Sequence, residues 1–354
     1  MTRPVNRREF MRVSAGVAAG FGLAGSSEAQ TPAPAGQSGG SAAQAPAAEA
    51  PLVFKTKMQK ALIVRPTEDD LKQLKDAGFD GVEGSREVQP DEAAKTRAIA
   101  EKMGMRVHAV LYGWAEFNSP DPKEVERTFA ESQAALRTAA AFGADAVLLV
   151  PCRIGPRGGR GAQPSTMRIP RAWEFQIEYD EKTGHLERVV YGDNTPYDEY
   201  IKAHNHAIDT STEWIKRLIP LAEQLKVVLA IENVGNNLWV RPAIFRHFLR
   251  SFQSPWVKAY FDIANHLRYA APEEWILTLG DLLAKVHIKD YKLNPSDPNG
   301  RGAGANIREG DVRWPVVRQA LEVVGYSGWL TIEGSGSLPM EERSKRLDLI
   351  IAGR

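Results

Sequence analysis

The segment VVLAIEN (Val227–Asn233) is a short run of β-branched and aliphatic residues that ends in polar side chains. The same pattern returns in AYFDIAN (259–265), KVHIKD (285–290) and WLTIEG (329–334). Short apolar runs of this kind predict buried strands. At or next to the end of each run stands a residue that can bind a metal: Glu232, Asp262, His287 and Glu333.

The rest of the chain from Pro51 alternates in the same way between strand-like and amphipathic segments. The predicted strands are Lys60–Val64, Gly81–Glu83, Arg106–Leu111, Ala146–Val150, Val227–Glu232, Ala259–Asp262, Lys285–Lys289 and Trp329–Glu333. The predicted helices are Glu68–Ala77, Glu92–Met103, Lys123–Phe142, Tyr197–Leu225, Pro242–Phe252, Pro272–Leu279, Trp314–Val324 and Met340–Ile351. Eight such pairs predict an α/β fold, a single closed (β/α)8 TIM barrel over residues 51–354.

One segment, Pro151–Asp193, does not fit the repeat. It holds an Arg/Gly stretch, Arg157–Gly161, and two strand-like runs, Trp173–Tyr179 and Leu186–Tyr191, on either side of Asp180–Gly184. The two runs predict a β-hairpin inserted after the fourth strand. Because such loops open on the catalytic face of a barrel, the insertion either covers the site or decorates the surface beside it.

The N-terminus predicts export. Arg7 and Arg8 precede a weakly apolar run from Val13 to Ala24, the pattern of a twin-arginine signal, and we expect cleavage near residue 29. Residues 30–50 are rich in Ala, Pro and Gly and predict a disordered linker. The expected location is therefore periplasmic or secreted.

Charge and cysteine content narrow the class of protein. The 45 Lys and Arg nearly balance 44 Asp and Glu, so no nucleic-acid partner and no stable membrane insertion are expected, and a small polar substrate fits better. The single cysteine, Cys152, cannot form a disulfide within the chain. The sequence leaves open whether the protein is a homo-oligomer.

The four polar strand ends predict a metal site. In a barrel, the carboxyl ends of neighbouring strands share one rim, so Glu232, Asp262, His287 and Glu333 are expected to converge. Three carboxylates in one cavity repel each other unless a cation compensates. One imidazole with three carboxylates suits one divalent ion, and we expect Mn²⁺, with Mg²⁺ or Co²⁺ as alternatives.

These motifs carry a resemblance to a known family. Glu232-Asn233, Asp262–Asn265, Val286–Asp290, Gly310–Pro315 and Gly325–Glu333 resemble the xylose-isomerase-like sugar isomerases and epimerases, and most closely the ketose 3-epimerases among them. The resemblance implies a carbohydrate substrate and assigns the four residues above to the metal. It further implies that Glu232 and Glu333 move the proton.

The expected chemistry is the interconversion of sugars through a cis-enediolate. A metal stabilises the charge that develops when a proton leaves the carbon beside a carbonyl, and carboxylates can take and return that proton. The substrate is expected to be a non-phosphorylated ketose or keto-glycoside, because phosphorylated sugars are scarce outside the cytoplasm. The candidate substrate-binding residues are Glu83, His108, Trp239, Asn265, His266 and Lys289. Glu83 and His108 are predicted at the rim, at or near the ends of the second and third strands, where they either bind substrate or have a purely structural role.

Several of these assignments have alternatives. Many family members carry His where this chain has Asn265, and His266 either turns into the site or caps the next helix. Lys289 stands two residues after His287 and could point away from the lumen. Among tryptophans, Trp239 is favoured for stacking on a sugar because it follows Glu232 closely.

Other functions remain open at this stage. A metal-assisted lyase or hydrolase of 3-keto-glycosides could use the same enediolate, and a secreted sugar-binding protein could keep the barrel without catalysis. A metal-dependent apurinic endonuclease fits less well, since it would need more histidines at strand ends and a basic DNA-binding face.

Overall fold

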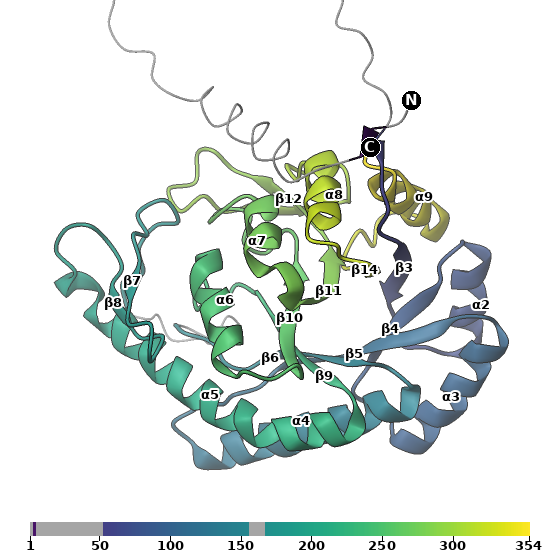
Figure 1. Cartoon of the computed structure of the whole chain (residues 1–354), viewed down its shortest axis with the longest axis horizontal. Coiled ribbons are helices and arrows are strands. Elements are labelled where there is room, and N and C mark those ends of the chain that lie inside the picture. The colour runs from purple at the N-terminus through teal and green to yellow at the C-terminus, as the bar shows by residue number, and fades with distance from the viewer. Residues whose placement is uncertain (1–2, 5–51, 156–166) are drawn as a thin grey trace, which may run out of the picture. The chain divides into compact units, whose positions relative to one another are not determined.

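The computed structural model describes residues 3–4, 52–155 and 167–354 (Figure 1). The chain divides into two units, Met1–Lys55 and Thr56–Arg354. In the first, β1 (Arg3–Pro4) pairs in parallel with β2 (Leu52–Val53). Apart from Arg3 and Pro4, the expected signal (1–29) and linker (30–50) lie outside the described residues.

The second unit is the predicted barrel. Its eight strands are all parallel and close on themselves, because the last strand pairs with the first from Gly328–Met58 to Ile332–Leu62. In order around the ring they are β3 (Met58–Ile63), β4 (Gly81–Ser85), β5 (Arg106–Trp114), β6 (Ala146–Val150), β9 (Val228–Glu232), β10 (Val257–Asp262), β11 (Leu283–Ile288) and β14 (Gly328–Ile332). Each overlaps its predicted range, so the fold prediction is confirmed.

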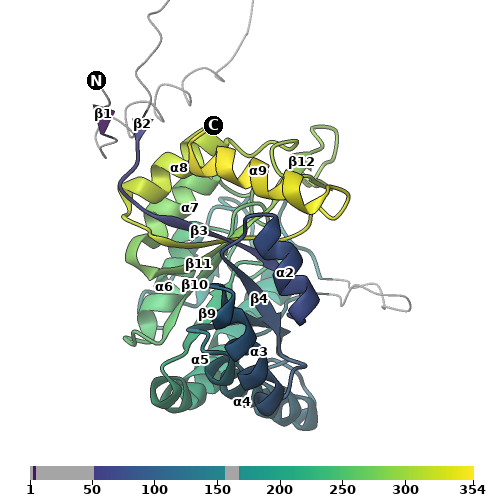
Figure 2. The ribbon, with the colours of Figure 1, turned by 90° about the vertical axis from the view of Figure 1, so that its right-hand side faces the viewer.

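A helix follows each barrel strand and lies outside the ring (Figure 1). Figure 2 shows α8 and α9 packed side by side on one flank of the barrel. The helices are α2 (Glu68–Asp76), α3 (Pro90–Lys102), α4 (Pro122–Phe142), α5 (Asp198–Leu225), α6 (Pro242–Ser251), α7 (Pro272–Leu279), α8 (Trp314–Val323) and α9 (Met340–Ile351). None of them is long and apolar enough to cross a bilayer, within the described residues.

Local sequence explains where these helices begin and which face they bury. Before α2, the hydroxyl of Thr67 accepts the amide of Asp70, and the Asp70 carboxylate accepts the amide of Thr67, which is a capping box. Leu71 and Leu74 lie three residues apart on one side of this helix, and both are fully buried. Gly143 ends α4 with φ 71°, a conformation that glycine adopts without steric cost.

The insertion after β6 contains the predicted hairpin, although its strands are short. They are β7 (Glu178–Tyr179) and β8 (Leu186–Arg188). The Asn205 side chain on α5 accepts the amide of Leu186 and donates to its carbonyl, and His185 pairs with Asp209 at 2.7 Å. The hairpin is therefore fastened to the flank of α5. The Arg157–Gly161 stretch falls outside the described residues.

A second hairpin was not predicted. β12 (Asp290–Leu293) pairs with β13 (Gly302–Ala305), directly after β11. Asp290 holds its base, because this buried carboxylate accepts the backbone amides of Arg308 and Val312 and the indole N–H of Trp314. Asp290 therefore has a structural role at the rim, one residue beyond Lys289.

The interior of the barrel has an apolar side and a polar side. Ala146, Leu148, Val150 and Ala230 pack with Tyr260 in a buried cluster beneath the ends of β6, β9 and β10. On the other side lie buried polar residues: Glu83, His108, Lys285, His287 and Thr331. Barrel interiors are usually filled by branched aliphatic side chains, so a polar side is unusual. The functional site described below accounts for it.

Close packing at the start of β4 gives a test of the fold. A Cβ at Gly81 would lie 2.2 Å from the carbonyl oxygen of Arg106 and 2.7 Å from the Trp329 ring. We expect Gly81→Ala to lower the free energy of unfolding by about 1–3 kcal/mol, because strand or ring must move. Gly304→Ala in β13, where a Cβ meets nothing within 4 Å, should change it by less than about 0.5 kcal/mol. Urea unfolding curves of both variants measure this, and equal stability would contradict the packing described.

Candidate metal centre

The four residues expected to bind a metal converge at the carboxyl ends of β9, β10, β11 and β14. One ligand atom from each of Glu232, Asp262, His287 and Glu333 lies within 4.8 Å of the others. Asp262 and His287 are fully buried, whereas the Glu333 side chain is about one-third exposed. The cluster therefore has a buried floor and one accessible side.

The Asp262 side chain is oriented by backbone amides of the residues that follow it. One carboxylate oxygen, Oδ1, accepts the amides of Ala264 and Asn265 at 2.8 and 2.6 Å. Asn233, next to Glu232 in sequence, donates to the carbonyl of Asp262 and accepts its amide at 2.7 Å. These bonds fix the side chain and leave Oδ2 without a hydrogen-bond partner among the described residues.

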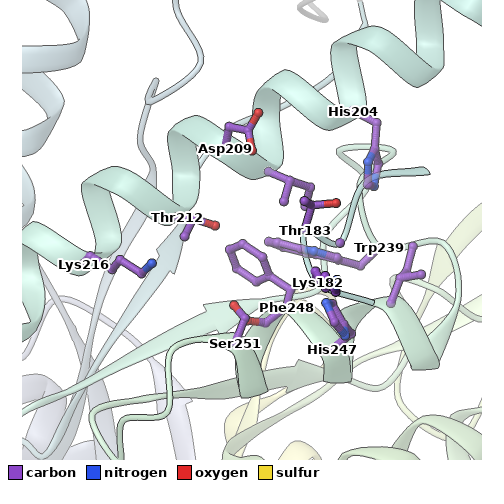
Figure 3. A pocket seen from close by; sticks show the side chains of 13 residues that line it. Lys182, Thr183, His204, Asp209, Thr212, Lys216, Trp239, His247, Phe248 and Ser251 are labelled. Carbon is purple, nitrogen blue, oxygen red and sulfur yellow. The ribbon is translucent and has the colours of Figure 1, made fainter. Parts of the chain in front are cut away.

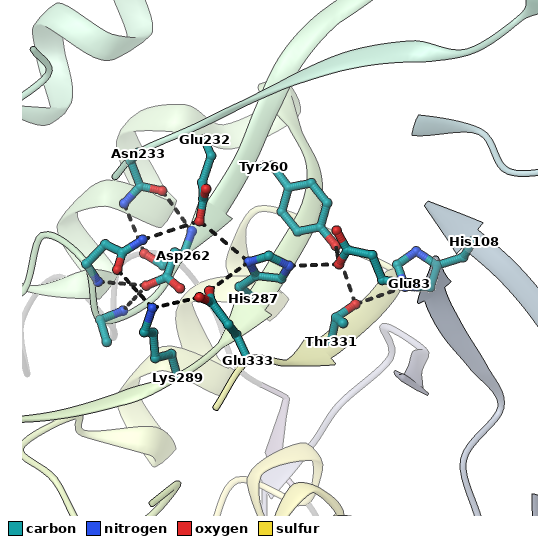
Figure 4. A network of polar contacts seen from close by, with 12 residues as sticks. Glu83, His108, Glu232, Asn233, Tyr260, Asp262, His287, Lys289, Thr331 and Glu333 are labelled. Carbon is teal, nitrogen blue, oxygen red and sulfur yellow. Dashed lines mark hydrogen bonds and ion pairs between the residues drawn. The ribbon is translucent and has the colours of Figure 1, made fainter. Parts of the chain in front are cut away.

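His287 is held from beneath by Glu83. Its Nε2–H donates to Glu83 Oε2 at 2.8 Å, and the Tyr260 hydroxyl donates to the same oxygen at 2.6 Å. The other ring nitrogen, Nδ1, therefore faces the cluster, 3.2 Å from Glu333 and 3.6 Å from Glu232 (Figure 4). A carboxylate on the far nitrogen fixes the tautomer of a metal-binding histidine and raises its basicity.

The two glutamates are held on opposite sides of His287. Lys289 Nζ donates to Glu333 Oε1 at 2.9 Å and to Asn265 Oδ1 at 3.3 Å. Asn265 in turn donates to Glu232 Oε1 at 3.3 Å. Lys289 therefore points into the site, where it links both glutamates through one amide (Figure 4).

The electrostatics of the cluster separate the carboxylates. Burial raises the pKa of Asp262 to about 8 against the opposing charge of Lys289, and burial also raises the pKa of Glu232. Burial acts in the same direction on Glu333, but the close contact with His287 and the charge and hydrogen bond of Lys289 lower its pKa overall. At neutral pH the protein alone therefore does not keep all three carboxylates ionised.

The residues fit a divalent cation. Asp262 Oδ2, His287 Nδ1 and Glu333 Oε2 are buried and without a hydrogen-bond partner in the described part of the chain, and they belong to residues whose ligand atoms lie within 4.8 Å of one another. A cation there would satisfy these atoms and would also relieve the repulsion that raises the pKa of Asp262.

Glu83 and His108 lie elsewhere than expected. Both were placed at the rim by sequence, but β4 continues to Ser85 and β5 to Trp114, so these side chains lie inside the barrel and are fully buried. His108 is hydrogen-bonded to Thr331 at 2.9 Å and stacked on Trp329. The expected direct contact with substrate is therefore corrected to a supporting position beneath His287 (Figure 4).

Trp239 and His266 also point away from the cluster. Trp239 is fully buried against Phe245 and Phe248, where it borders a flank cavity of about 220 Å³ between α5 and α6 (Figure 3). His266 Nε2 is hydrogen-bonded to the carbonyl of Val234, and burial lowers the pKa of its ring to about 4. Neither side chain faces the metal cluster in this structure, so the expected contact of Trp239 with a sugar at the cluster is corrected, and of the two alternatives for His266 the one that turns it into the site is not observed.

A cavity gives access to the cluster. It measures about 380 Å³ and is lined by Lys289 and Glu333, by Gly304–Asn306 of the β12–β13 hairpin, and by residues 334–337 after β14. This volume falls in the range of about 300–1,000 Å³ that is usual for small-molecule sites. The unpredicted hairpin therefore forms one wall of the approach.

Sequence reasoning missed two supporting residues. Tyr260 and Asn233 hold Glu83 and Asp262 in place, yet neither was assigned a role. A signal existed for Tyr260, since strand residues two apart face the same side and Asp262 was already assigned to the rim. Asn233 could have been found from its position directly after a metal-binding glutamate.

Comparison with solved structures identifies the fold. At 15% identity, 3-keto-D-glucoside 4-epimerase from E. coli aligns with a TM-score of 0.59 over 83% of this chain and 99% of its own. D-psicose 3-epimerase from Clostridium cellulolyticum H10 aligns at 15% identity with a TM-score of 0.58, over 83% and 98%. A xylose isomerase domain protein from Planctomyces limnophilus gives 0.58 at 15% identity, over 85% and 98%.

Sequence comparison agrees with the fold. None of the curated proteins matches this sequence significantly. Residues 71–348, however, match the family described as xylose isomerase-like TIM barrel, and this span includes the whole cluster. The chain therefore belongs to the xylose isomerase-like TIM barrel family.

Proposed function

We propose that this protein is a divalent-metal-dependent sugar isomerase or epimerase that works through a cis-enediolate of a non-phosphorylated ketose or keto-glycoside. The observation that carries the proposal is the cluster itself, in which two glutamates flank one imidazole and three ligand atoms are left unpartnered. Mn²⁺ is the proposed ion, because the donor set is three carboxylates and one imidazole.

The chemistry divides between the ion and the chain. A bound cation would supply Lewis acidity, which stabilises negative charge on the substrate oxygens. Glu232 and Glu333 would do the proton transfer, one removing the proton beside the carbonyl and the other returning it. If the proton returns to the opposite face of the same carbon, the configuration inverts; if it returns to the neighbouring carbon, aldose and ketose interconvert.

Lys289 and Asn265 would position this pair. The contact with His287 and the ammonium of Lys289 lower the pKa of Glu333, so this carboxylate is ionised at neutral pH, the form that a base needs. Burial raises the pKa of Glu232, so this carboxyl group holds a proton more readily than Glu333 does. Two carboxylates with shifts in opposite directions are the arrangement that acid–base chemistry needs.

The names of the structural relatives support this class. One is an epimerase of a 3-keto-D-glucoside, and another is a 3-epimerase of D-psicose. At this level of identity they share the fold with this chain.

Removal of the metal provides the first test. If the protein is loaded with free Mn²⁺ at one hundred times its Kd, chelation by EDTA should lower the free energy of unfolding by about 2.7 kcal/mol, because only the folded state presents the four ligands together. Asp262→Asn should weaken Mn²⁺ binding at least about tenfold in calorimetry. Asp209→Asn, a carboxylate on α5 outside the cluster, is the control. Wild-type affinity in Asp262→Asn would contradict the site.

Proton exchange tests the glutamates. In deuterated water with saturating Mn²⁺, the wild type should place solvent deuterium beside the carbonyl of its ketose, and Glu333→Gln should slow this by about 10²–10⁴-fold because it removes a base. Glu309→Gln, which alters a carboxylate lining the same cavity, should keep wild-type exchange.

The same measurement separates the competing functions. Loss of an aglycone from a 3-keto-glycoside would favour a lyase or hydrolase, whereas metal binding without any exchange would favour a sugar-binding protein. Full exchange activity in Glu333→Gln would refute its proposed role in proton transfer.

We also propose that the protein is exported by the twin-arginine pathway, on the strength of Arg7 and Arg8 before the apolar run. The double change Arg7→Lys and Arg8→Lys should retain full-length protein in the cytoplasm, since the pathway reads this pair. Arg3→Lys should leave export unchanged. Cell fractionation with mass measurement of the N-terminus decides, and equal export of all three proteins would exclude this route.

A further inference from the structure

A second cavity lies among the loops of the catalytic face. It measures about 510 Å³ and is lined by segments that follow β6, β9 and β10 and by the tip of the β12–β13 hairpin. In a parallel barrel these segments all leave the carboxyl ends of the strands. Gly235 follows Glu232 by three residues, and Arg268 follows Asn265 by three. Two of the segments that line this cavity therefore come directly after residues of the metal cluster in the chain.

Two arginines line this cavity, Arg268 and Arg301. Arg268 donates to the Tyr269 hydroxyl at 2.6 Å and lies 4.6 Å above its ring. Neither guanidinium forms an ion pair with a carboxylate anywhere in the described ranges 52–155 and 167–354. The nearby acid is Asp297, whose Oδ1 accepts the backbone amides of Arg301 and Asn299. These bonds and then the charges of Arg301 and Arg268 lower the pKa of Asp297, so its carboxylate partly balances the two arginines. No carboxylate is among the described residues that line the cavity itself, so the cavity is basic on balance.

A third arginine, Arg241, lies next to this cavity. It donates to the backbone carbonyls of Tyr269, Ala172 and Phe175, while the charge of Glu274 acts on it from nearby. Burial raises the pKa of the Tyr269 phenol, while the charges of Arg268, Arg301 and Arg241 all oppose that rise. The charges of three guanidinium groups thus act on one tyrosine at this edge of the site.

The opposite wall is rigid. Asn237 has a left-handed backbone, with φ 61°, and its side chain donates to the carbonyl of Ile154 at 3.0 Å. The carbonyl of Asn237 accepts the Tyr200 hydroxyl at 2.8 Å. These two hydrogen bonds hold the loop after β9 in place. A loop that is already ordered favours binding, because it loses little conformational entropy when a ligand binds.

We propose that this cavity binds a carboxylate carried by the sugar substrate, so that the protein acts on an acidic ketose or keto-glycoside. The inference rests on the proposed function, and it adds the substrate class. A neutral sugar would leave the positive charge of the two guanidinium groups only partly balanced by Asp297, whereas a planar carboxylate would add a second anion and matches their paired N–H donors. The acidic metal cluster and this basic cavity then fix opposite ends of one molecule.

The test compares three ketoses that differ only at C6: D-fructose, D-fructuronate and D-fructose 6-phosphate. By calorimetry in Mn²⁺ buffer, wild type should bind D-fructuronate at least about tenfold more tightly than D-fructose, as a charge-assisted pair predicts. Arg268→Gln and Arg301→Gln should each remove most of this preference, measured as the ratio of the D-fructuronate affinity to the D-fructose affinity. Arg137→Gln, which removes an exposed charge on α4, should retain it.

Several outcomes would overturn the inference. These are equal affinity for the neutral and acidic sugars, or a preference that survives in the Arg268→Gln, Arg301→Gln double variant. Tighter binding of the 6-phosphate, lost in the same variants, would assign the cavity to phosphate instead. A general loss of folding would weaken D-fructose binding too, so the ratio of affinities separates it from loss of the anion contact.

The same data distinguish failure of the inference from failure of the proposed function. Binding preference requires no turnover, so it can hold even if no sugar exchanges deuterium. Conversely, exchange on D-fructose with no preference for D-fructuronate would refute the anion cavity and leave the isomerase or epimerase assignment intact.

Discussion

The structure depends on one electrostatic constraint: three carboxylates and one imidazole meet at a single buried point. Like charges in a water-poor site repel each other and lose hydration, and the rise in the pKa of Asp262 to about 8 expresses both costs. The surroundings are arranged to hold each ligand by one atom while a second atom stays available. Backbone amides hold Asp262, Glu83 holds His287, and Lys289 holds Glu333.

The polar side of the barrel interior follows from this constraint. Glu83 holds His287 through its Oε2 atom, and the Tyr260 hydroxyl donates to the same oxygen. Thr331 and His108 continue the hydrogen-bonded chain towards Trp329. The interior opposite, from β6 to β9, needs no such chain and is filled by Ala and Leu side chains. Many of the buried polar side chains thus support the metal cluster.

The rim combines opposite charges. The cluster is acidic, whereas the neighbouring cavity carries Arg268 and Arg301. Loops that follow β9 and β10 contribute to both. The proposed acidic substrate would span the two, so that one barrel would position its reactive carbon and its carboxylate together.

The sequence by itself determined the barrel and the four converging residues. The alternation of strand and helix patterns is local, and the polar strand ends needed only the rule that parallel strands share a rim. The sequence could not determine how deep in the barrel each side chain lies. Glu83 and His108 were predicted at the rim, but how far β4 and β5 extend depends on pairing with neighbouring strands. The sequence left the direction of Lys289 open, and it did not reveal that Trp239 is buried by α6 or that Arg268 and Arg301 share a cavity. Those facts depend on contacts between residues far apart in the chain, which only the tertiary structure decides.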